Sequence, residues 1–233
     1  MKPTSWTQSA NLAIEGIIYA VKTQRHMRLH LLAALSVLLL SLFLNISRGD
    51  LILLSLAIVL VLVAEMLNTA IELTVDMISK TYDPQAKVIK DIGAGGVLLA
   101  SIGAITLAYF LLYPALKELV WGGPIGSRKA PGDIVAFVSL AAVIIVVIII
   151  KALLGTGEPL RGGMPSGHAA VSFSIWVAVI FLSGALPLVI LTFIPAAMVS
   201  WSRWSSGIHR PAEVLAGALI GGGVTLLLFM LFA

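Results

Sequence analysis

The sequence contains no cysteine and little charge: of its 233 residues, 11% are Asp, Glu, Lys or Arg, and 7% are aromatic. The absence of cysteine excludes disulfide bonds and catalysis by a thiolate. The scarcity of charge argues against an ordinary soluble domain, in which about 25% of the residues are charged. The net charge of +4 lies in loops between apolar segments, which indicates contact with a membrane surface, and no nucleic-acid motif is present.

Apolar residues make up 59% of the chain and gather into long stretches without charge between their ends. Six stretches approach the roughly 20 residues that a membrane helix requires: residues 31–48, 51–65, 97–117, 134–151, 169–203 and 214–233. The fifth is too long for one helix, and Ser183, Gly184 and Pro187 predict a turn within it. The sequence therefore predicts an all-α, polytopic membrane helix bundle with about seven transmembrane helices.

The segment before the first stretch predicts an amphipathic helix on the membrane surface, because apolar residues recur at helical spacing opposite polar ones. The apolar set is Trp6, Ala10, Ile14, Ile17, Ile18 and Val21, and the polar set is Thr7, Asn11, Glu15 and Lys22. The alternative is a helix packed on the flank of the bundle. The first apolar stretch begins too late for a cleavable signal, so we expect the mature protein to keep every residue.

A loop at residues 117–133 divides the predicted bundle into two domains. Its glycines and prolines predict no packed element: Gly122, Gly123, Pro124, Gly126, Pro131 and Gly132. Three spans precede it, in a domain of residues 1–116, and four spans follow it, in a domain of residues 134–233. We find no internal repeat that relates the two halves.

Polar side chains form one stripe along the second predicted span. At about 100° per residue, the four residues of the stripe lie within roughly 80° of one another: Glu65, Asn68, Glu72 and Asp76. A charged side chain inside a membrane costs at least about 2.5 kcal/mol, so such residues persist where they are paired, hydrated or functional. Because carboxylate and amide oxygens suit magnesium, we interpret the stripe as a divalent-cation and phosphate site. The alternative is a hydrogen-bonded seam between helices.

The stripe and a later motif together resemble the small bacterial diacylglycerol and undecaprenol kinases. The matching patterns are Glu65-x-x-Asn68-Thr69-Ala70-x-Glu72-x-x-x-Asp76 and Lys90-Asp91-x-Gly93-Ala94, and the resemblance covers about residues 5–115. It implies a three-span protomer that assembles as a homo-oligomer, a trimer, and uses magnesium and ATP to phosphorylate a lipid alcohol. It also implies that Glu65 is the general base, that Glu72 holds magnesium, and that the nucleotide site is lined by Asn68, Asp76, Lys90 and Asp91.

One position departs from the kinase pattern. Between residues 16 and 30 the family has a glutamate, a second magnesium ligand, where this chain has Gln24. An amide oxygen still coordinates magnesium but brings no charge to it. Gln24 therefore favours the alternative in which the kinase-like half is an inactive assembly scaffold.

A second polar cluster lies on two loops of the C-terminal half, at the start or end of predicted spans: Lys151, Arg161, Ser166, Gly167, His168, Arg203, His209 and Glu213. Phosphoryl transfer requires positive charge and hydrogen-bond donors around the phosphate, a nucleophile, and an acid for the leaving oxygen. The basic residues supply the charge, Ser166 and Gly167 at a helix N-terminus supply donors, and the histidines supply nucleophile and acid. Glu213 follows His209 by four residues, a spacing at which its carboxylate can fix the imidazole tautomer.

This cluster resembles the signature of the type 2 phosphatidic acid phosphatases: a lysine-led first motif, PSGH, and Ser-Arg-x5-His-x3-Asp. The resemblance covers about residues 134–233. It implies that His209 attacks phosphorus to form a phosphohistidine, that His168 protonates the leaving lipid oxygen, and that no metal takes part. Two positions depart from the signature: Glu158 stands where the family has arginine, and Glu213 where it has aspartate. We expect Arg161 to substitute for that arginine.

The two resemblances predict a multi-pass enzyme of the bacterial inner membrane whose partners are the membrane, a lipid phosphate and a lipid alcohol. We expect a lipid phosphatase fused to a lipid kinase; the alternatives are a phosphatase alone, and a transporter or lipid-binding protein that uses the polar stripe as an ion path. The third leaves the histidine loops unexplained. With the N-terminus inside, Lys and Arg on the inner side outnumber those outside by eleven to four, so we expect both sites to face the cytoplasm.

Overall fold

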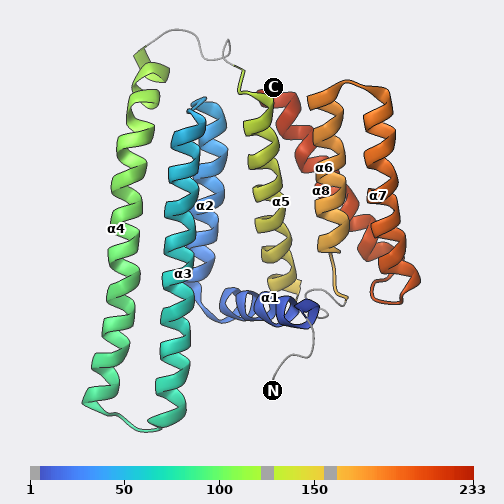
Figure 1. Cartoon of the computed structure of the whole chain (residues 1–233). Coiled ribbons are helices and arrows are strands. Elements are labelled where there is room, and N and C mark those ends of the chain that lie inside the picture. The colour runs from blue at the N-terminus through green and yellow to red at the C-terminus, as the bar shows by residue number, and fades with distance from the viewer. Residues whose placement is uncertain (1–5, 122–128, 155–161) are drawn as a thin grey trace. The chain divides into compact units, whose positions relative to one another are not determined.

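The computed structural model describes residues 6–121, 129–154 and 162–233, and this part of the chain consists of helices without strands (Figure 1). The helices are α1 (Trp6–Thr23), α2 (Arg25–Phe43), α3 (Arg48–Ile78), α4 (Pro84–Trp121), α5 (Gly132–Leu154), α6 (Gly167–Ser183), α7 (Leu186–Ser205) and α8 (Pro211–Phe232). They form two compact units, which are described separately. One is Thr23–Arg128, and the other is Met1–Lys22 with Lys129–Ala233.

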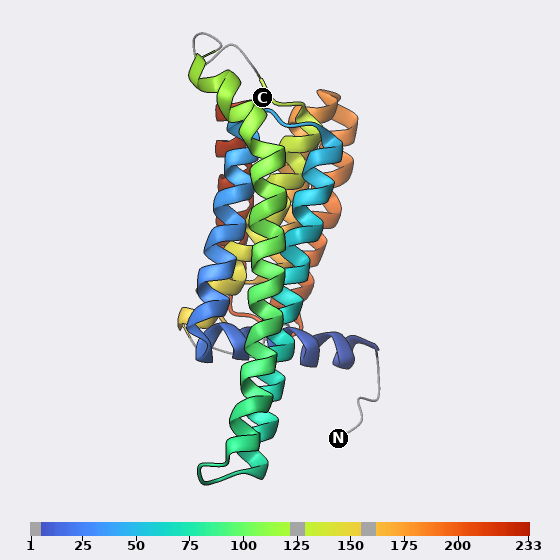
Figure 2. The same cartoon turned by 90° about the vertical axis from the view of Figure 1, so that its left-hand side faces the viewer.

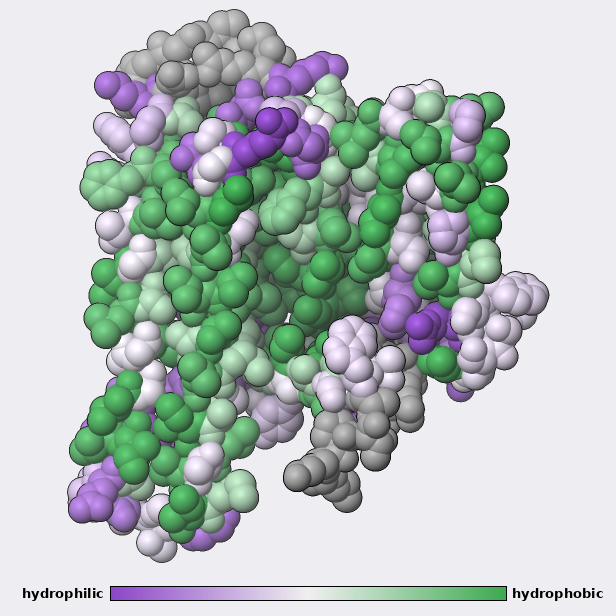
Figure 3. Space-filling model, viewed as in Figure 1, coloured by the Kyte–Doolittle hydropathy of each residue, from purple (hydrophilic) through white to green (hydrophobic). Residues whose placement is uncertain are grey.

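The length and composition of the helices confirm the predicted membrane bundle. Six of the described helices are long and apolar enough to cross a membrane, namely α2, α3, α4, α5, α7 and α8. The 17-residue α6 is also apolar but shorter than these six. The predicted number of seven transmembrane helices is reached only when α6 is counted with them. Hydrophobic residues cover most of the visible sides of the helices, and hydrophilic residues gather toward their ends (Figure 3). The predicted turn between α6 and α7 is present, with Gly184 at a φ of 59°.

The unit Thr23–Arg128 is built on α3, which packs against both α2 and α4. Helices α3 and α4 run side by side over most of their length (Figures 1 and 2). Their short connection is closed by Asp83, whose Oδ1 accepts a hydrogen bond from the backbone N–H of Gln85 at 2.7 Å, and Pro84 is the first residue of α4. The end of α3 that carries the polar stripe therefore lies beside the beginning of α4.

In the other unit, α6 and α8 pack at backbone contact. A Cβ added at Gly217 would lie 2.2 Å from the carbonyl oxygen of Ser166, and one added at Gly221 would lie 1.9 Å from that of Ala170. Small residues four apart on one helix face allow this approach in a membrane. Two neighbouring glycines of α8, Gly222 and Gly223, do not meet the backbone of α6 in this way. A Cβ at Gly222 would make ordinary contact with Val177, and one at Gly223 would meet no described heavy atom within 4 Å.

Helix α1 packs in this second unit, at the end where α5 finishes and where α6 and α8 begin (Figure 1). The predicted N-terminal helix is therefore present. Its apolar residues Ile18, Ala20 and Val21 are buried, but so is the polar Asn11. Part of the polar side of the helix is thus covered by protein.

Candidate active sites

The imidazole of His209 is held in a fixed orientation by Glu213. The backbone N–H of His209 donates to the carbonyl of Arg203 at 3.0 Å, and Pro211 then begins α8. Nδ1 of His209 lies 2.8 Å from Oε2 of Glu213, which also accepts from the backbone N–H of Arg210 at 3.3 Å. Because an ionised carboxylate only accepts, Nδ1 carries the proton, and Nε2 is the nitrogen with a free lone pair. The contact predicted from the four-residue spacing is present.

The segment before α6 is hydrogen-bonded to α8 at Glu213, the residue that holds His209. The backbone N–H of Ser166 donates to the carbonyl of Glu213 at 2.9 Å, so the N-terminus of α6 is fixed to the first turn of α8. Lys151, buried near the end of α5, donates from Nζ to the carbonyls of Gly162 and Gly163 at 3.0 and 3.4 Å. Thus α5, the loop before α6, and α8 meet at one end of the unit.

Three polar side-chain atoms at this junction lack partners in the described part of the chain: two can donate to an anion, and the third is the nitrogen with a free lone pair. Among the described residues, Nε2 of His209, Nε of Arg203 and Oγ of Ser166 are buried without a hydrogen-bond partner. Buried polar atoms are ordinarily hydrogen-bonded, because leaving them unpaired costs free energy. A phosphoryl group would offer several oxygens to Nε of Arg203 and Oγ of Ser166 while its phosphorus faced Nε2 of His209.

The charges around His209 favour its neutral form. Burial lowers the pKa of its imidazole from the ordinary value of 6.5, and the positive charges of Lys151 and Arg203 act in the same direction. The hydrogen bond and charge of Glu213 oppose them by raising that pKa. Near neutral pH, Nε2 is therefore unprotonated, as nucleophilic attack requires.

His168 lies in the same electrostatic environment, because Arg203, His209 and Lys151 are all close enough to act on it. It also lines a cavity of about 480 Å³ together with Arg203 and Ile208. The remaining lining comes from α1 and includes Asn11 and Glu15, which the sequence analysis did not place in a site. The predicted residues Arg161 and Glu158 lie outside the described part of the chain.

In the unit Thr23–Arg128, the predicted polar stripe runs along one face of α3. Glu65 and Asn68 are buried, and Glu72 is half-buried. Nδ2 of Asn68 donates to Oε1 of Glu72 at 3.0 Å, whereas its Oδ1 is buried without a partner among the described residues. A Cβ at Gly93 of α4 would lie 2.6 Å from this oxygen. Glycine at this position of the motif therefore leaves room for the amide of Asn68.

Gln24 reaches the stripe directly, since its Nε2 donates to Oε2 of Glu72 at 3.3 Å. Two amides thus converge on both oxygens of one carboxylate. Within the described residues, no three His, Asp or Glu side chains gather as a metal centre. The set still fits magnesium held by Glu72, one amide oxygen, water and nucleotide phosphates, because this ion commonly takes only one or two carboxylates from a protein.

The predicted nucleotide residues occupy the ends of α3 and α4. Nζ of Lys90 lies 2.5 Å from Oδ1 of Asp76, and Nζ of Lys87 lies 2.7 Å from Oδ2 of Asp91. These side chains are largely exposed, so each pair contributes little to stability and is free to exchange its partner for a phosphate or a metal. The structure brings Asp76, Lys90 and the Glu72 group to one end of the unit.

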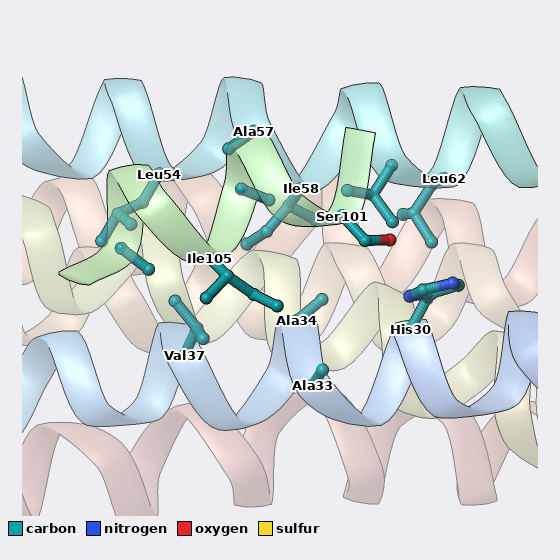
Figure 4. A pocket seen from close by; sticks show the side chains of 13 residues that line it. His30, Ala33, Ala34, Val37, Leu54, Ala57, Ile58, Leu62, Ser101 and Ile105 are labelled. Atoms are coloured by element: carbon teal, nitrogen blue, oxygen red, sulfur yellow. The ribbon is translucent and has the colours of Figure 1, made fainter. Parts of the chain in front are cut away.

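A cavity of about 220 Å³ lies between α2, α3 and α4 farther along the same unit. Side chains of all three helices point into it, among them Val37, Leu54 and Ile105 (Figure 4). His30 and Ser101 are the polar residues of its lining. Such an apolar surface suits a hydrocarbon chain better than a nucleotide.

Comparison with known proteins assigns each half of the chain to a family. Residues 11–112 match the family model of prokaryotic diacylglycerol kinase, and residues 98–233 match that of the PAP2 superfamily. A diacylglycerol kinase of Synechocystis sp. is 34% identical over 127 residues, which are 52% of this chain and 73% of that protein. An undecaprenol kinase of Bacillus subtilis is 33% identical over 101 residues, 43% of this chain and 82% of that protein. No solved structure matches.

Proposed function

Because the chain belongs to the PAP2 superfamily and, in its N-terminal half, to the prokaryotic diacylglycerol kinases, we propose that it is a bifunctional lipid kinase and phosphatase. Membership of these families makes it a membrane enzyme that acts on lipid phosphates. The proposal adds that both halves are active and that they work in the bacterial inner membrane. The names of the two relatives make diacylglycerol, undecaprenol and their phosphates the first substrates to test.

The phosphatase reaction would start at Nε2 of His209. This nitrogen attacks phosphorus, the bond from phosphorus to the lipid oxygen breaks, and the released alkoxide takes a proton from His168, which must enter the step as the imidazolium. Water then attacks the phosphohistidine, giving its proton to His168, and the bond from phosphorus to nitrogen breaks to release phosphate. Arg203 and Ser166 hold the phosphoryl oxygens, and the charge of Lys151 stabilises them. We expect Arg161 to contribute from the preceding loop.

The main observation in support of this proposal is the hydrogen bonding of the two ring nitrogens of His209. Glu213 holds Nδ1 at 2.8 Å, while Nε2 is buried without a partner among the described atoms, as are Nε of Arg203 and Oγ of Ser166. A histidine kept only for packing would be expected to use both ring nitrogens or to expose one, because a buried unpaired nitrogen is costly.

In the kinase-like half, we propose that Glu65 accepts the proton of the lipid hydroxyl as that oxygen attacks the terminal phosphate of ATP. Glu72 and Gln24 would hold magnesium, which neutralises phosphate charge when bound. Asn68, Asp76, Lys90 and Asp91 would line the nucleotide site. The hydrocarbon chain of the alcohol would occupy the apolar cavity of this unit. Assembly as a trimer is part of the same proposal.

One panel assay of purified protein tests both halves. It measures phosphate release from lipid mono- and diphosphates, and ATP-dependent phosphorylation of diacylglycerol and undecaprenol. We expect His209→Ala to abolish phosphate release and His168→Ala to reduce it severely, because nucleophile and acid act as one unit. Brief incubation with radiolabelled substrate should leave acid-labile label on the wild type and none on the His209 variant.

The same assay contains its controls. Ser206→Ala, an exposed change on the loop of His209, should leave phosphate release unchanged. Kinase activity should survive His209→Ala, which also shows that the variant is folded, whereas Glu65→Gln should remove it. Wild-type phosphate release by the His209 variant would overturn the phosphohistidine mechanism. Phosphate release without any kinase activity would support the scaffold alternative.

A further inference from the structure

The cavity that contains His168 and Arg203 is closed on one side by α1. Its 480 Å³ are lined on that side by Trp6, Thr7, Gln8, Ala10, Asn11, Leu12 and Glu15. This volume lies in the range of roughly 300–1,000 Å³ that is usual for small-molecule sites. Residues 11–22 lie within the segment that matches the kinase family, yet they pack in the unit of the phosphatase site. Helix α1 therefore lies where it can contact a substrate of the phosphatase site.

The reaction geometry determines which part of the substrate meets α1. The phosphoryl group must touch Nε2 of His209 and the donors beside it, including Arg203. His168 must touch the leaving oxygen in order to protonate it. Since His168 lines the cavity and His209 does not, the cavity extends from the phosphate site on the leaving-group side. The atoms attached to the leaving oxygen would then lie against α1.

The α1 side of this cavity carries a fixed carboxylate. Asn11 is buried, and its Nδ2 donates to Oε1 of Glu15 at 2.7 Å, which holds the half-buried carboxylate in one position. No basic side chain of α1 lines the cavity, and Arg203 is the one cation among its described lining residues. A negative charge at this position attracts hydroxyl or ammonium donors and repels a second phosphate, and partial burial weakens solvent screening.

From this arrangement we propose that α1 forms the leaving-group side of the phosphatase pocket, and that Glu15 selects lipid monophosphates over lipid diphosphates. A monophosphate ester leaves as an uncharged alcohol once His168 has protonated it. A diphosphate attacked at its terminal phosphorus leaves as a lipid phosphate, whose charge would lie beside Glu15. The inference rests on the proposed phosphatase function and names its substrate class.

The test compares farnesyl phosphate with farnesyl diphosphate, which share one lipid chain and differ in the leaving group. The purified full chain is assayed for kcat/KM on each, as wild type and as Glu15→Gln. Glutamine keeps the size of the side chain and its ability to accept from Asn11, but removes the charge. We expect the ratio of diphosphate to monophosphate kcat/KM to rise by about tenfold or more in Glu15→Gln.

A matched control comes from the same helix. Lys22→Gln also changes one charge, at an exposed position of α1 that does not line the cavity, and it should leave the ratio unchanged. The phosphohistidine is the same species from either substrate, so Glu15→Gln should also leave its rate of hydrolysis unchanged. An effect confined to the first step separates leaving-group recognition from a general loss of structure.

The outcomes distinguish this inference from the function on which it rests. If the wild type releases phosphate from neither probe nor from any other lipid phosphate, the proposed phosphatase function fails. If it releases phosphate in a His209-dependent way but Glu15→Gln leaves the substrate ratio unchanged, only the role of Glu15 is overturned. A shift of similar size in the opposite direction in Lys22→Gln, which removes a charge of the other sign, would also overturn it, because the effect would then come from net charge.

Discussion

The close contact between α6 and α8 predicts that no side chain larger than that of glycine fits at Gly221 without moving a helix. An alanine Cβ at this position would lie 1.9 Å from the carbonyl oxygen of Ala170, and 2.6 and 2.7 Å from its carbonyl carbon and Cα. Ordinary van der Waals contacts of Cβ atoms lie at 3.4–4 Å. All three obstructing atoms belong to backbone, which cannot rotate away as a side chain can. Helix α8 would therefore have to move outward from α6.

We expect Gly221→Ala to destabilise the protein by about 1–3 kcal/mol, the usual cost of overpacking a core. In a chain of this size, that cost lowers the midpoint of thermal unfolding by about 2–12 °C. Movement of α8 would also displace Glu213 at its first turn, so phosphate release should fall while kinase activity persists. Circular dichroism of the purified protein in detergent measures the midpoint, and the panel assay measures both activities.

Gly223→Ala is the matched control, because it makes the same chemical change on the same helix with no described heavy atom within 4 Å of the added Cβ. Alanine is favoured over glycine within a helix by up to about 1 kcal/mol, so this variant should melt at or above the wild-type temperature. If Gly221→Ala unfolds at the same temperature as Gly223→Ala and keeps its phosphatase activity, the close contact between α6 and α8 does not exist in the membrane protein.

Three further predictions concern pH, magnesium and topology. The rate of phosphate release should fall as the pH drops below 6.5, because the reaction requires neutral His209, whose pKa is lowered from that value. In Glu213→Gln this fall should move to lower pH, because Glu213 raises the pKa of His209. The kcat of this variant should also be reduced by about a hundredfold or more. Gln24→Glu should increase kinase activity and lower the magnesium requirement by adding an anionic ligand, and an unchanged magnesium titration would show that this ligand is dispensable. In spheroplasts, a membrane-impermeant thiol reagent should label Ser183→Cys but not Ser206→Cys, and the reverse pattern would place the phosphatase site outside.

Features set by short-range chemistry were the ones that the sequence predicted well. The turn predicted from Ser183, Gly184 and Pro187 ends α6 where expected, with Gly184 as its C-cap. The contact between His209 and Glu213 followed from a spacing of one helical turn. The polar stripe of α3 also depended only on helical periodicity, and Asn68 and Glu72 meet as that periodicity requires.

The parts that the sequence did not predict depend on contacts between distant segments. Of the four glycines of α8, Gly217 and Gly221 meet the backbone of α6, whereas a Cβ at Gly222 would meet the side chain of Val177 and one at Gly223 would meet no described heavy atom within 4 Å. Which glycines approach the backbone depends on where the neighbouring helix lies. The acceptors of Lys151 are backbone carbonyls, which carry no residue-specific signal. An amphipathic pattern predicts that a helix has an apolar side, but it does not say what covers the polar side. For that reason Glu15 was placed only on the polar side of an amphipathic helix, although it lines the cavity of His168.

The proposed combination of activities places a chemical constraint on the substrates. A kinase that makes a lipid monophosphate and a phosphatase that consumes the same monophosphate would together hydrolyse ATP without net change in the lipid. The preference for monophosphates that we assign to Glu15 makes this constraint stronger, because it directs the phosphatase toward the class of product that the kinase forms. The two sites share no residue, and the described lining of each cavity comes from one unit. Each site is therefore free to select its own lipid, and productive bifunctionality requires that the kinase and the phosphatase accept lipids with different alcohol groups.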